Sequence, residues 1–435
     1  MHDKTINGKS LEAISAQYFD EIATLSDRIW HYAEVQFETP KSSRLLGNYL
    51  VSKGFDVTYG VAGVEHAFVA TWGSGPKTVG FLAEFDALEG MGQKALAYVN
   101  CPNGSPGHGC GHNLLGAGAV FAALLCKDVI ETEDTNTTIK VFGCPAEESG
   151  YAKAIMAEKG VFDGTTFMLT WHPNAYSQVW VERTLAVNTL KLTFRGKASH
   201  ASGAPECGRS ALDACELMNV GVNYLREHMP STSRIHYAYL DAGGKSANVV
   251  QQQATLHYYV RAENRDVLDN LVQRVKQVAK GAALMTETTV SIETDARCLD
   301  YNANEPLSKL LESVMHEAGA VHLDDHDLNH LSWYAITPSD AIFDTTIRPG
   351  AYGSQDFVST DVGDVSWRVP TAQIFIACEP QGTPMHSWQW VDNGTSSVAH
   401  KGIQKAGVVL ALTAIRALHN KKLLQEIEAA YKASL

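Results

Sequence analysis

The sequence predicts an α/β protein in which a mainly parallel sheet is flanked by helices and a smaller βαββαβ domain is inserted. Short apolar runs at 78–83, 138–142 and 166–170 alternate with helical patterns, which is typical of a mainly parallel α/β sheet. From about residue 187 the pattern changes to half-exposed, alternating strands, which indicates a separate domain. Because candidate metal ligands lie on both sides of that segment, the chain is expected to leave the first domain and return to it.

The main domain begins with apolar residues at helical spacing. Residues 9–35 predict one amphipathic helix that covers a face of the sheet. Its apolar positions are Ile14, Tyr18, Ile22, Leu25 and Ile29. A helix near the other end of the chain is expected to pack back on the larger domain, with an apolar stripe formed by Ile403, Val408, Leu412 and Ile415. Residues 321–357 are polar and turn-rich, with no clear period.

Residues 187–293 predict a self-contained domain in the order strand, helix, two strands, helix, strand. The strands are expected at 188–194, 234–240, 253–261 and 288–292. The two helices present the apolar stripes Leu212, Cys215, Met218, Val222 and Leu225, and Val267, Leu271, Val275 and Val278. The remaining residues, 1–186 and 294–435, are expected to form the larger, catalytic domain.

The composition favours a protein that acts on a small molecule. With 435 residues, 45% of them hydrophobic, the chain can bury two cores. Its net charge of −13 argues against a nucleic-acid partner or an anionic membrane, since both need clustered Lys and Arg. No segment has the apolar length of a signal peptide or of a membrane span, so a cytoplasmic protein is expected. Its eight scattered cysteines predict free thiols rather than a disulfide framework.

The side chains that could hold a metal are spread over the main domain. Cys110 and His112 stand two residues apart before a helix rich in small residues, and Glu148, His172 and His386 follow downstream near strand ends. Thiolate, imidazole and carboxylate ligands suit zinc-class and manganese-class ions. Five such ligands are too many for one open tetrahedral ion, and they suit two ions that share a water. The proton acceptor that this chemistry also needs could be Glu147.

Each of these residues also has a structural explanation when taken alone. Glu147 and Glu148 could begin a solvated helix, Cys110 could be a small buried residue, and His172 could end a strand. Asp86 could cap a turn or orient a metal-bound histidine. Their combination near the strand ends of a predicted α/β sheet favours a metal site.

Two other motifs are weaker. His322, His326 and His330 have helical ligand spacing, but the aspartates between them favour a solvated segment. Residues 73–78 look like a phosphate loop but lack the required glycine before the lysine, so a turn or a hairpin is expected.

The same residues resemble a known family, the aminoacylase and glutamate-carboxypeptidase metallopeptidases, in the amidohydrolase branch that uses a Cys ligand. The resemblance covers nearly the whole chain and is close to the hydrolases of p-aminobenzoyl-glutamate. The motifs that carry it are His108-Gly-Cys-Gly-His-Asn-Leu-Leu-Gly, Gly143-Cys-Pro-Ala-Glu-Glu, Leu169-Thr-Trp-His-Pro, Gly208-Arg-Ser-Ala-Leu-Asp-Ala, Ser359-Thr-Asp-Val-Gly-Asp-Val-Ser-Trp and Gly382-Thr-Pro-Met-His-Ser-Trp.

The resemblance implies a dinuclear manganese or zinc centre and a role for each residue of the site. The implied ligands are Cys110, His112, Glu148, His172 and His386. Glu147 is implied as general base and then acid. The small domain is implied to be a dimerisation or lid domain, in which His200 enters the partner subunit's site and steadies the oxyanion. Asn248 and Arg261 are implied to bind the substrate's carboxylate, and Arg suits that task because its planar fork pairs carboxylates bidentately.

The sequence also departs from the family pattern. Asn113 stands where an Asp often follows the Cys-Gly-His, and Gln251 stands where a Pro is frequent. The segment 321–357 is shorter than in the p-aminobenzoyl-glutamate hydrolases. The change at Asn113 bears on the ligand shell, and the shorter segment bears on the identity of the substrate and on any obligatory partner chain.

The function expected from the sequence is that of a cytoplasmic metal-dependent amidohydrolase that cleaves an N-acyl amino acid. The leading substrate is p-aminobenzoyl-glutamate, a folate breakdown product, and indole-3-acetyl-aspartate is a rival. A dipeptidase or carboxypeptidase with the same centre is the alternative among metalloenzymes. A thiol-nucleophile hydrolase that uses Cys110 and His112, and a non-catalytic partner subunit, also remain open. A homodimer is expected, or a heterodimer with a paralogous subunit.

Overall fold

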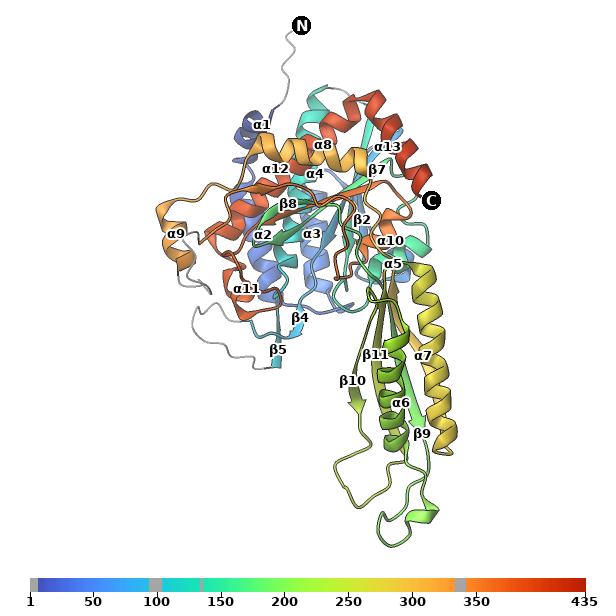
Figure 1. The fold of residues 1–435 in the computed structure, drawn as a ribbon. Coiled ribbons are helices and arrows are strands. Elements are labelled where there is room, and N and C mark those ends of the chain that lie inside the picture. Colours follow the sequence, from blue (N-terminus) through green and yellow to red (C-terminus); the bar gives the residue numbers. More distant parts are fainter. Residues whose placement is uncertain (1–6, 94–103, 134–135, 333–341) are drawn as a thin grey trace. The chain divides into compact units, whose positions relative to one another are not determined.

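The computed structural model describes residues 7–93, 104–133, 136–332 and 342–435. The chain divides into two compact units (Figure 1). Unit 1 contains Met1–Glu182, Asn302–Ser354 and Asp364–Leu435. Unit 2 contains Arg183–Tyr301 and also Gln355–Gly363, a short return segment that the sequence did not predict. The chain therefore leaves unit 1 and comes back to it twice.

Unit 1 is built on an eight-stranded sheet in the order β1-β2-β6-β3-β7-β14-β8-β13. Its strands, in that order, are Asp56–Tyr59, Phe68–Gly73, Thr137–Cys144, Lys77–Glu84, Phe167–Asn174, Thr371–Ala377, Ser177–Trp180 and Ile347–Arg348. The four central strands β6, β3, β7 and β14 run parallel. Strands β1 and β2 pair antiparallel with their neighbours, and β8 pairs antiparallel with β14 but parallel with β13. The three predicted apolar runs are β3, β6 and β7. Their nearly continuous apolar sequences reflect burial on both faces, and the mainly parallel fold class is confirmed.

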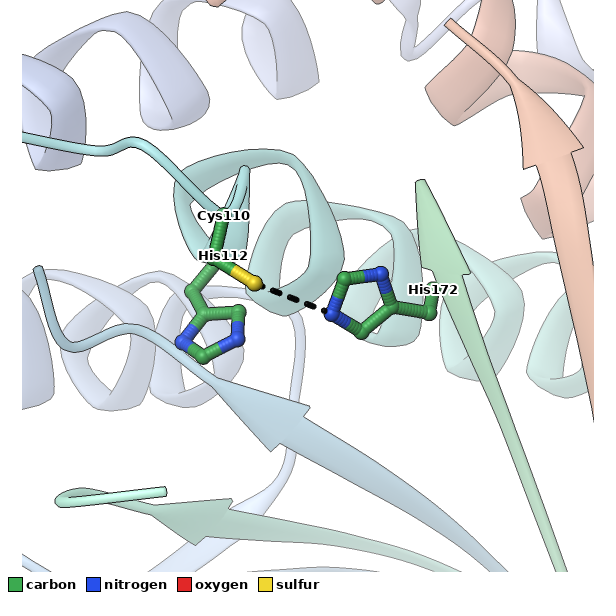
Figure 2. Close-up of side chains that lie close together, drawn as sticks. All are labelled: Cys110, His112 and His172. Atoms are coloured by element: carbon green, nitrogen blue, oxygen red, sulfur yellow. Dashed lines mark hydrogen bonds between the residues drawn. The ribbon is translucent and has the colours of Figure 1, made fainter. Parts of the chain in front are cut away.

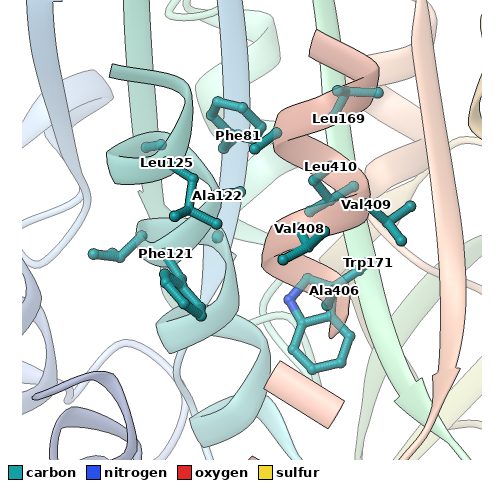
Figure 3. Packing of buried hydrophobic residues seen from close by; sticks show 14 of the residues in the cluster. Phe81, Phe121, Ala122, Leu125, Leu169, Trp171, Ala406, Val408, Val409 and Leu410 are labelled. Carbon is teal, nitrogen blue, oxygen red and sulfur yellow. The ribbon is translucent and has the colours of Figure 1, made fainter. Parts of the chain in front are cut away.

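The main helices of unit 1 are α1 Gly8–Ser15, α2 Phe19–Tyr32, α3 Pro40–Ser52, α4 His112–Glu133, α5 Ala152–Glu158, α8 Glu305–Ala318, α9 Asp325–Ser332, α11 Trp388–Asn393, α12 Ser397–His419 and α13 Lys421–Ser434. Of these, α3, α4, α8 and α12 pack directly on the sheet and bury its apolar side chains. Figure 3 shows α4 and α12 side by side, with Phe121 and Val408 among the core residues. His112–Thr132 of α4 is apolar and long enough to cross a membrane, but 89% of that window is buried inside the protein, as in a core helix.

The N-terminal segment is two helices rather than the single helix predicted over 9–35. Helix α1 ends at Ser15, and a turn closed by hydrogen bonds from Gln17 and Tyr18 leads into α2. The break has a packing reason. Helix α1 contacts α12 and α8, whereas α2 lies mainly against α4 and α3, and one straight helix cannot follow both directions. Helix α2 therefore rests chiefly on other helices and not, as predicted, on the sheet.

Several smaller features complete unit 1. Strands β4 Leu88–Gly90 and β5 Gly104–Gly107 pair with each other. Residues 74–76 join β2 to β3 across the intervening β6, so this segment is a turn but not a hairpin. The seven described cysteines are free thiols, as predicted. Cys101, and residues 333–341 of the segment 321–357, lie outside the described residues. The short helix α10 Val362–Ser366 lies where the chain passes from unit 2 to unit 1 for the second time.

Unit 2 has a four-stranded antiparallel sheet in the order β10-β11-β9-β12. Its elements, in chain order, are β9 Ala186–Arg195, α6 Ala211–Leu225, β10 Arg234–Asp241, β11 Gln253–Ala262, α7 Arg265–Met285 and β12 Thr289–Cys298. This order is the predicted βαββαβ arrangement. Leu256 and Tyr258 of β11 are fully buried against α6 and α7. Tyr259 and Arg261 alternate with them and lie on the opposite face of the sheet.

Candidate metal centre

The loop before α4 places Cys110 and His112 in the interior of unit 1. Gly111 between them has φ +74°, and a Cβ on it would lie 2.7 Å from Pro173 Cγ, so only glycine fits this turn. His112 is the first residue of α4 and is fully buried. Cys110 Sγ lies 3.5 Å from Nε2 of His172, and a dashed line marks this contact in Figure 2. The turn thus brings the two halves of the sequence-predicted ligand set together.

Nε2 of the buried His112 and Nε2 of the half-buried His172 face the other candidate ligands. Nδ1 of His172 lies 2.7 Å from the carbonyl oxygen of Pro173, which can only accept, so Nδ1 carries the proton. Nδ1 of His112 donates in the same way to Asp86 Oδ1 at 3.2 Å. Asp86 also accepts the backbone N–H of Glu148 at 3.1 Å, so it orients two candidate ligands at once. A hydrogen bond of this kind fixes the tautomer of a metal-binding histidine.

The two glutamates follow a turn after β6. Ala146 adopts a left-handed conformation with φ +57°, and the chain then turns so that Glu147 and Glu148 both approach His112. One carboxylate oxygen of each lies 3.9 Å from His112 Nε2. The turn allows adjacent side chains to converge, whereas a strand would point them to opposite faces.

His386 reaches the same place from a loop after β14. Its backbone N–H donates to Gly109 O at 3.0 Å, and its Nε2 lies 3.6 Å from Glu148 Oε2. The residue has φ +56°, an uncommon conformation for a non-glycine residue that often occurs at functional sites. His386 is half exposed, so it borders the open side of the site.

The donor atoms form overlapping groups that fit metal ions. Ligand atoms within 4.8 Å of one another occur in the groups Cys110, His112 and His172; Cys110, Glu148 and His386; and Glu84, His112 and Glu147. His112 Nε2 and Glu148 Oε1 are buried without a hydrogen-bond partner. Such atoms are costly unless something binds them. Sulfur, imidazole and carboxylate donors, shared between neighbouring groups, fit a pair of divalent ions.

Sequence reasoning missed Glu84 and Lys153. Glu84 ends β3, and its Oε2 lies 3.4 Å from His112 Nε2. Its Oε1 lies 2.8 Å from Nζ of Lys153, a lysine of α5 that is fully buried. Burial raises the pKa of Glu84, but the positive charges of Lys153 and His112 outweigh it and lower that pKa overall. The available signal was a charged residue at the end of a buried strand, two positions before Asp86.

Burial and nearby charges change the pKa values of the candidate ligands. Burial, together with the nearby Glu148, raises the pKa of Cys110 well above its usual range. Burial and His112 lower the pKa of His172 to about 4, so this imidazole is neutral at pH 7. Burial also raises the pKa of Glu148, against the opposing effects of His112 and His386. The thiol of Cys110 must therefore lose a proton when a metal ion binds.

The three candidate residues of unit 2 occupy two ends of its sheet. Arg261 lies near the end of β11, where it pairs with Arg234 and Val187. Asn248 and His200 lie beyond the start of that strand, where His200 forms a bridge with Val249. The eight steps from position 253 to position 261 span roughly 27 Å along the strand. One small substrate therefore cannot touch Arg261 and His200 of the same chain.

His200 is exposed, and its ring is oriented by its own loop. Its Nδ1 accepts the backbone N–H of Gly203 at 3.0 Å and that of Ser202 at 3.3 Å. The proton of the neutral ring therefore resides on Nε2, which can donate. Nearby, the carbonyl of Asn248 accepts the backbone N–H of Ala201 at 2.9 Å.

The histidine triplet at 322–330 has a different explanation. Asp324, His326 and Asp327 do bring ligand atoms within 4.8 Å of one another. The cation at this place is Lys401, whose Nζ binds Asp327 and lies 2.9 Å from Asp324 Oδ2. His330 instead contacts Asn393 Oδ1 at 3.2 Å. The three histidines do not form the ligand stripe that their spacing suggests.

Comparisons with known proteins show which family the chain belongs to. Residues 187–286 match the family model of the peptidase dimerisation domain. The chain is 37% identical to a subunit of the p-aminobenzoyl-glutamate hydrolase of Escherichia coli, over 96% of this chain and 92% of that one. It is 29% identical to the Xaa-Arg dipeptidase of Mus musculus, over 98% and 93% of the two chains.

Among solved structures, the fold is similar to a dinuclear metal-binding peptidase of the M20 family from Bacillus subtilis. The TM-score is 0.57 at 14% identity, and the match covers 92% of this chain and 99% of that one. The similarity in fold extends over both units, and the sequence similarity to the Escherichia coli protein covers nearly the whole chain. The chain belongs to the M20 family of metallohydrolases, which act on amide and peptide bonds.

Proposed function

We propose that this protein hydrolyses the amide bond of an N-acyl amino acid and that p-aminobenzoyl-glutamate is its substrate. One observation carries the proposal. Cys110, His112, Glu148, His172 and His386 converge from separate segments on one place, with Glu147 beside them. The Escherichia coli relative supports the choice of substrate. The products would be p-aminobenzoate and glutamate.

Each residue has a task that its environment suits. Glu147 takes a proton from the attacking water and passes it to the leaving amine, because its carboxylate lies at the edge of the ligand group. The Nε2–H of His200 is free to donate to the oxyanion that develops on the carbonyl. Arg261 pairs with a carboxylate of the amino acid, and Asn248 assists with its amide.

Two divalent ions, manganese or zinc, would be held by the five ligands and would supply Lewis-acid polarisation and a more acidic water. The protein's own contribution is to fix the ligands before an ion arrives. Asp86 holds His112 and the backbone of Glu148, and Pro173 O holds His172. Such hydrogen-bonding partners reduce the rearrangement that binding requires.

A dimer follows from the separation of the unit 2 residues. Because His200 and Arg261 lie at opposite ends of one sheet, we propose that His200 and Asn248 serve the substrate bound to a second copy. The match to a peptidase dimerisation domain supports this assembly. A paralogous chain could take the place of the second copy, since the Escherichia coli relative is named as one subunit of its enzyme. The proposed location is the cytoplasm.

The test is glutamate release from p-aminobenzoyl-glutamate by the purified chain alone, after loading with manganese or zinc. Release by the wild type, and not by Glu147→Ala, is the expected result. Mass measurement of the active species would show whether the chains in it are identical. If the wild type releases no glutamate, indole-3-acetyl-aspartate is the next substrate to test, and failure of both substrates would contradict the proposed substrate class.

A dipeptidase is the second candidate, and the specific observation that favours it is the likeness to Xaa-Arg dipeptidase over nearly the whole chain. The same metal centre would serve either reaction, so the residues that bind the leaving group decide between them. A panel of Xaa-Arg dipeptides beside p-aminobenzoyl-glutamate separates the two functions by the ratio of their kcat/KM values.

Two other functions have less support. A nucleophilic Cys110 would need a lowered pKa, whereas burial and Glu148 raise the pKa of this thiol. A non-catalytic subunit would not need Glu147 and a full ligand set in one place. Loss of activity with a chelator, and its return with metal, would exclude both alternatives.

A further inference from the structure

Two arginines of unit 2 face each other without a carboxylate between them. Arg234 of β10 and Arg261 of β11 are direct partners in the antiparallel ladder, so their side chains leave the same face of the sheet. Like charges in this arrangement repel each other. Within the described residues, no carboxylate lies within ion-pair distance of either guanidinium.

Both guanidinium groups are nevertheless held in place. Nη1 of Arg234 donates to the carbonyls of Ser231 at 2.6 Å and Ser233 at 2.8 Å. Nη1 of Arg261 donates to the hydroxyl of Ser359 at 2.6 Å. In each arginine, the other N–H groups of the planar guanidinium can donate to an anion.

The return segment 355–363 fixes the pair from one side. The ring of Phe357 lies 4.7 Å from the guanidinium carbon of Arg234, and Ser359, two residues later, holds Arg261. Between these two residues, Val358 O accepts the backbone N–H of Leu185, the residue before β9, at 2.8 Å. The contacts of Phe357 and Ser359 therefore place both arginines beside this one segment.

The surrounding surface is suited to a negatively charged ligand. The next cross-strand pair on this face is His236 and Tyr259, whose rings stack with their centroids 5.8 Å apart. Burial lowers the pKa of His236, and the positive charge of Arg261 lowers it further. Glu263, the next acid along the chain after β11, accepts the hydroxyl of Thr232 at 3.0 Å. The face therefore carries two fixed positive charges flanked by aromatic rings.

We propose that Arg234 and Arg261 together bind the two carboxylates of a dicarboxylic amino acid, with Arg234 responsible for the side-chain carboxylate. The proposal rests on the proposed amidohydrolase function and makes its substrate class narrower. Two cations at paired positions of neighbouring strands can bind two carboxylates that are separated by a short aliphatic chain. An acyl glutamate or acyl aspartate satisfies both arginines, whereas an acyl glutamine or acyl leucine leaves Arg234 without a partner.

The kinetic test compares p-aminobenzoyl-glutamate with p-aminobenzoyl-glutamine, which differ only in the side-chain carboxylate and its amide. Arg234→Met is expected to lower kcat/KM for the glutamate substrate by about 10- to 100-fold, since it removes a charged hydrogen-bonding partner. It should leave kcat/KM for the glutamine substrate nearly unchanged. Arg261→Met should lower both, and Arg234→Lys should restore part of the preference.

The matched control is Arg265→Met, which removes an exposed arginine at the start of α7, 3.7 Å from Asp269. It should change the kinetics of neither substrate. An equal loss on both substrates in Arg234→Met would overturn the assignment of the side-chain carboxylate to Arg234.

A binding measurement tests the two arginines independently of the acyl group that the substrate carries. Calorimetry with glutarate and with butyrate compares a dicarboxylate with a monocarboxylate and needs no turnover. The wild type should bind glutarate at least about tenfold more tightly, and Arg234→Met should lose that difference. If the wild type binds both acids equally, the proposal that the two arginines bind two carboxylates is wrong. If the wild type prefers glutarate but releases no glutamate from p-aminobenzoyl-glutamate, only the proposed substrate is wrong.

Discussion

The candidate metal centre of unit 1 and the polar ends of the unit 2 sheet differ in burial and in the distances between their residues. In unit 1, His112, Glu84 and Lys153 are buried and lie within a few ångströms of one another. In unit 2, His200 and Arg234 are exposed and are oriented by their own loops. All candidate metal ligands of unit 1 come from one chain. The exposed groups lie at two ends of one sheet, too far apart for one small molecule to reach both.

This difference predicts different responses to mutation. Substitutions in the buried centre should change chemistry, stability and metal uptake in each chain separately. Substitutions in unit 2 should change substrate choice, or should be rescued by a second chain.

Glu147→Ala should lower kcat by about 10²- to 10⁴-fold, because the proton acceptor is lost. Metal content should stay near that of the wild type, since Cys110, His112, Glu148, His172 and His386 remain. Steady-state kinetics with metal analysis of the same sample is the measurement. Glu65→Ala, which changes an exposed glutamate of the same unit, is the control. Unchanged kcat in Glu147→Ala would remove this residue from the mechanism.

Lys153→Met should destabilise the metal-free protein by about 3–5 kcal/mol, because Glu84 would remain as a buried charge without its partner. The double variant Lys153→Met with Glu84→Gln should recover much of that loss, since both charges are then gone. Urea unfolding gives the free energies. Lys309→Met removes an exposed pair with Glu305 and should cost less than about 0.5 kcal/mol. Equal losses in the single and double variants would contradict the buried pair.

His200→Ala should lower kcat by about 10²- to 10³-fold, the usual effect of losing one oxyanion donor. Hybrid dimers with Glu147→Ala chains should recover activity, because each hybrid contains one intact composite site. Random mixing makes roughly half of the dimers hybrids, so activity should approach about a quarter of the wild-type value. Activity that stays at the level of the two parent variants would show that His200 does not act across a dimer.

Metal affinity should rise by at least about tenfold per pH unit near neutrality. The pKa of Cys110 is raised, so the thiol holds its proton at neutral pH and must release it to bind a metal. Raising the pH removes this competition and tightens binding. Chelator competition at several pH values measures the slope. Cys110→Ala should lower the slope, whereas Cys215→Ala, a buried cysteine of α6, should not. A slope that is equal in all three proteins would argue against Cys110 as a ligand.

Much of the fold was accessible from sequence because its signals are local. The apolar runs of β3, β6 and β7 and the alternation of β11 reflect burial on two faces or on one. The break between α1 and α2 was not accessible, because it depends on which helices each of them packs against. His172 was expected after a strand but lies inside β7, since the strand continues to Asn174.

The residues of the candidate site likewise divide into those that the sequence indicated and those that only the structure revealed. The residue types at 110, 112, 147, 148, 172 and 386 indicated metal chemistry, since thiol, imidazole and carboxylate side chains near strand ends are an informative combination. Lys153 gave no such signal. A lysine in a short helix is usually exposed, and only the approach of Glu84 explains why this one is buried.

The sequence by itself determined the fold class, the two-part organisation and the candidate donors, because hydrophobic period and side-chain chemistry are properties of the chain. Only the tertiary structure decided which candidate ligands hydrogen-bond to Asp86, that Glu84 and Lys153 belong to the centre, and that Arg234 stands opposite Arg261. These are contacts between distant segments. Strand register and helix packing set them, and neither can be read from a local pattern.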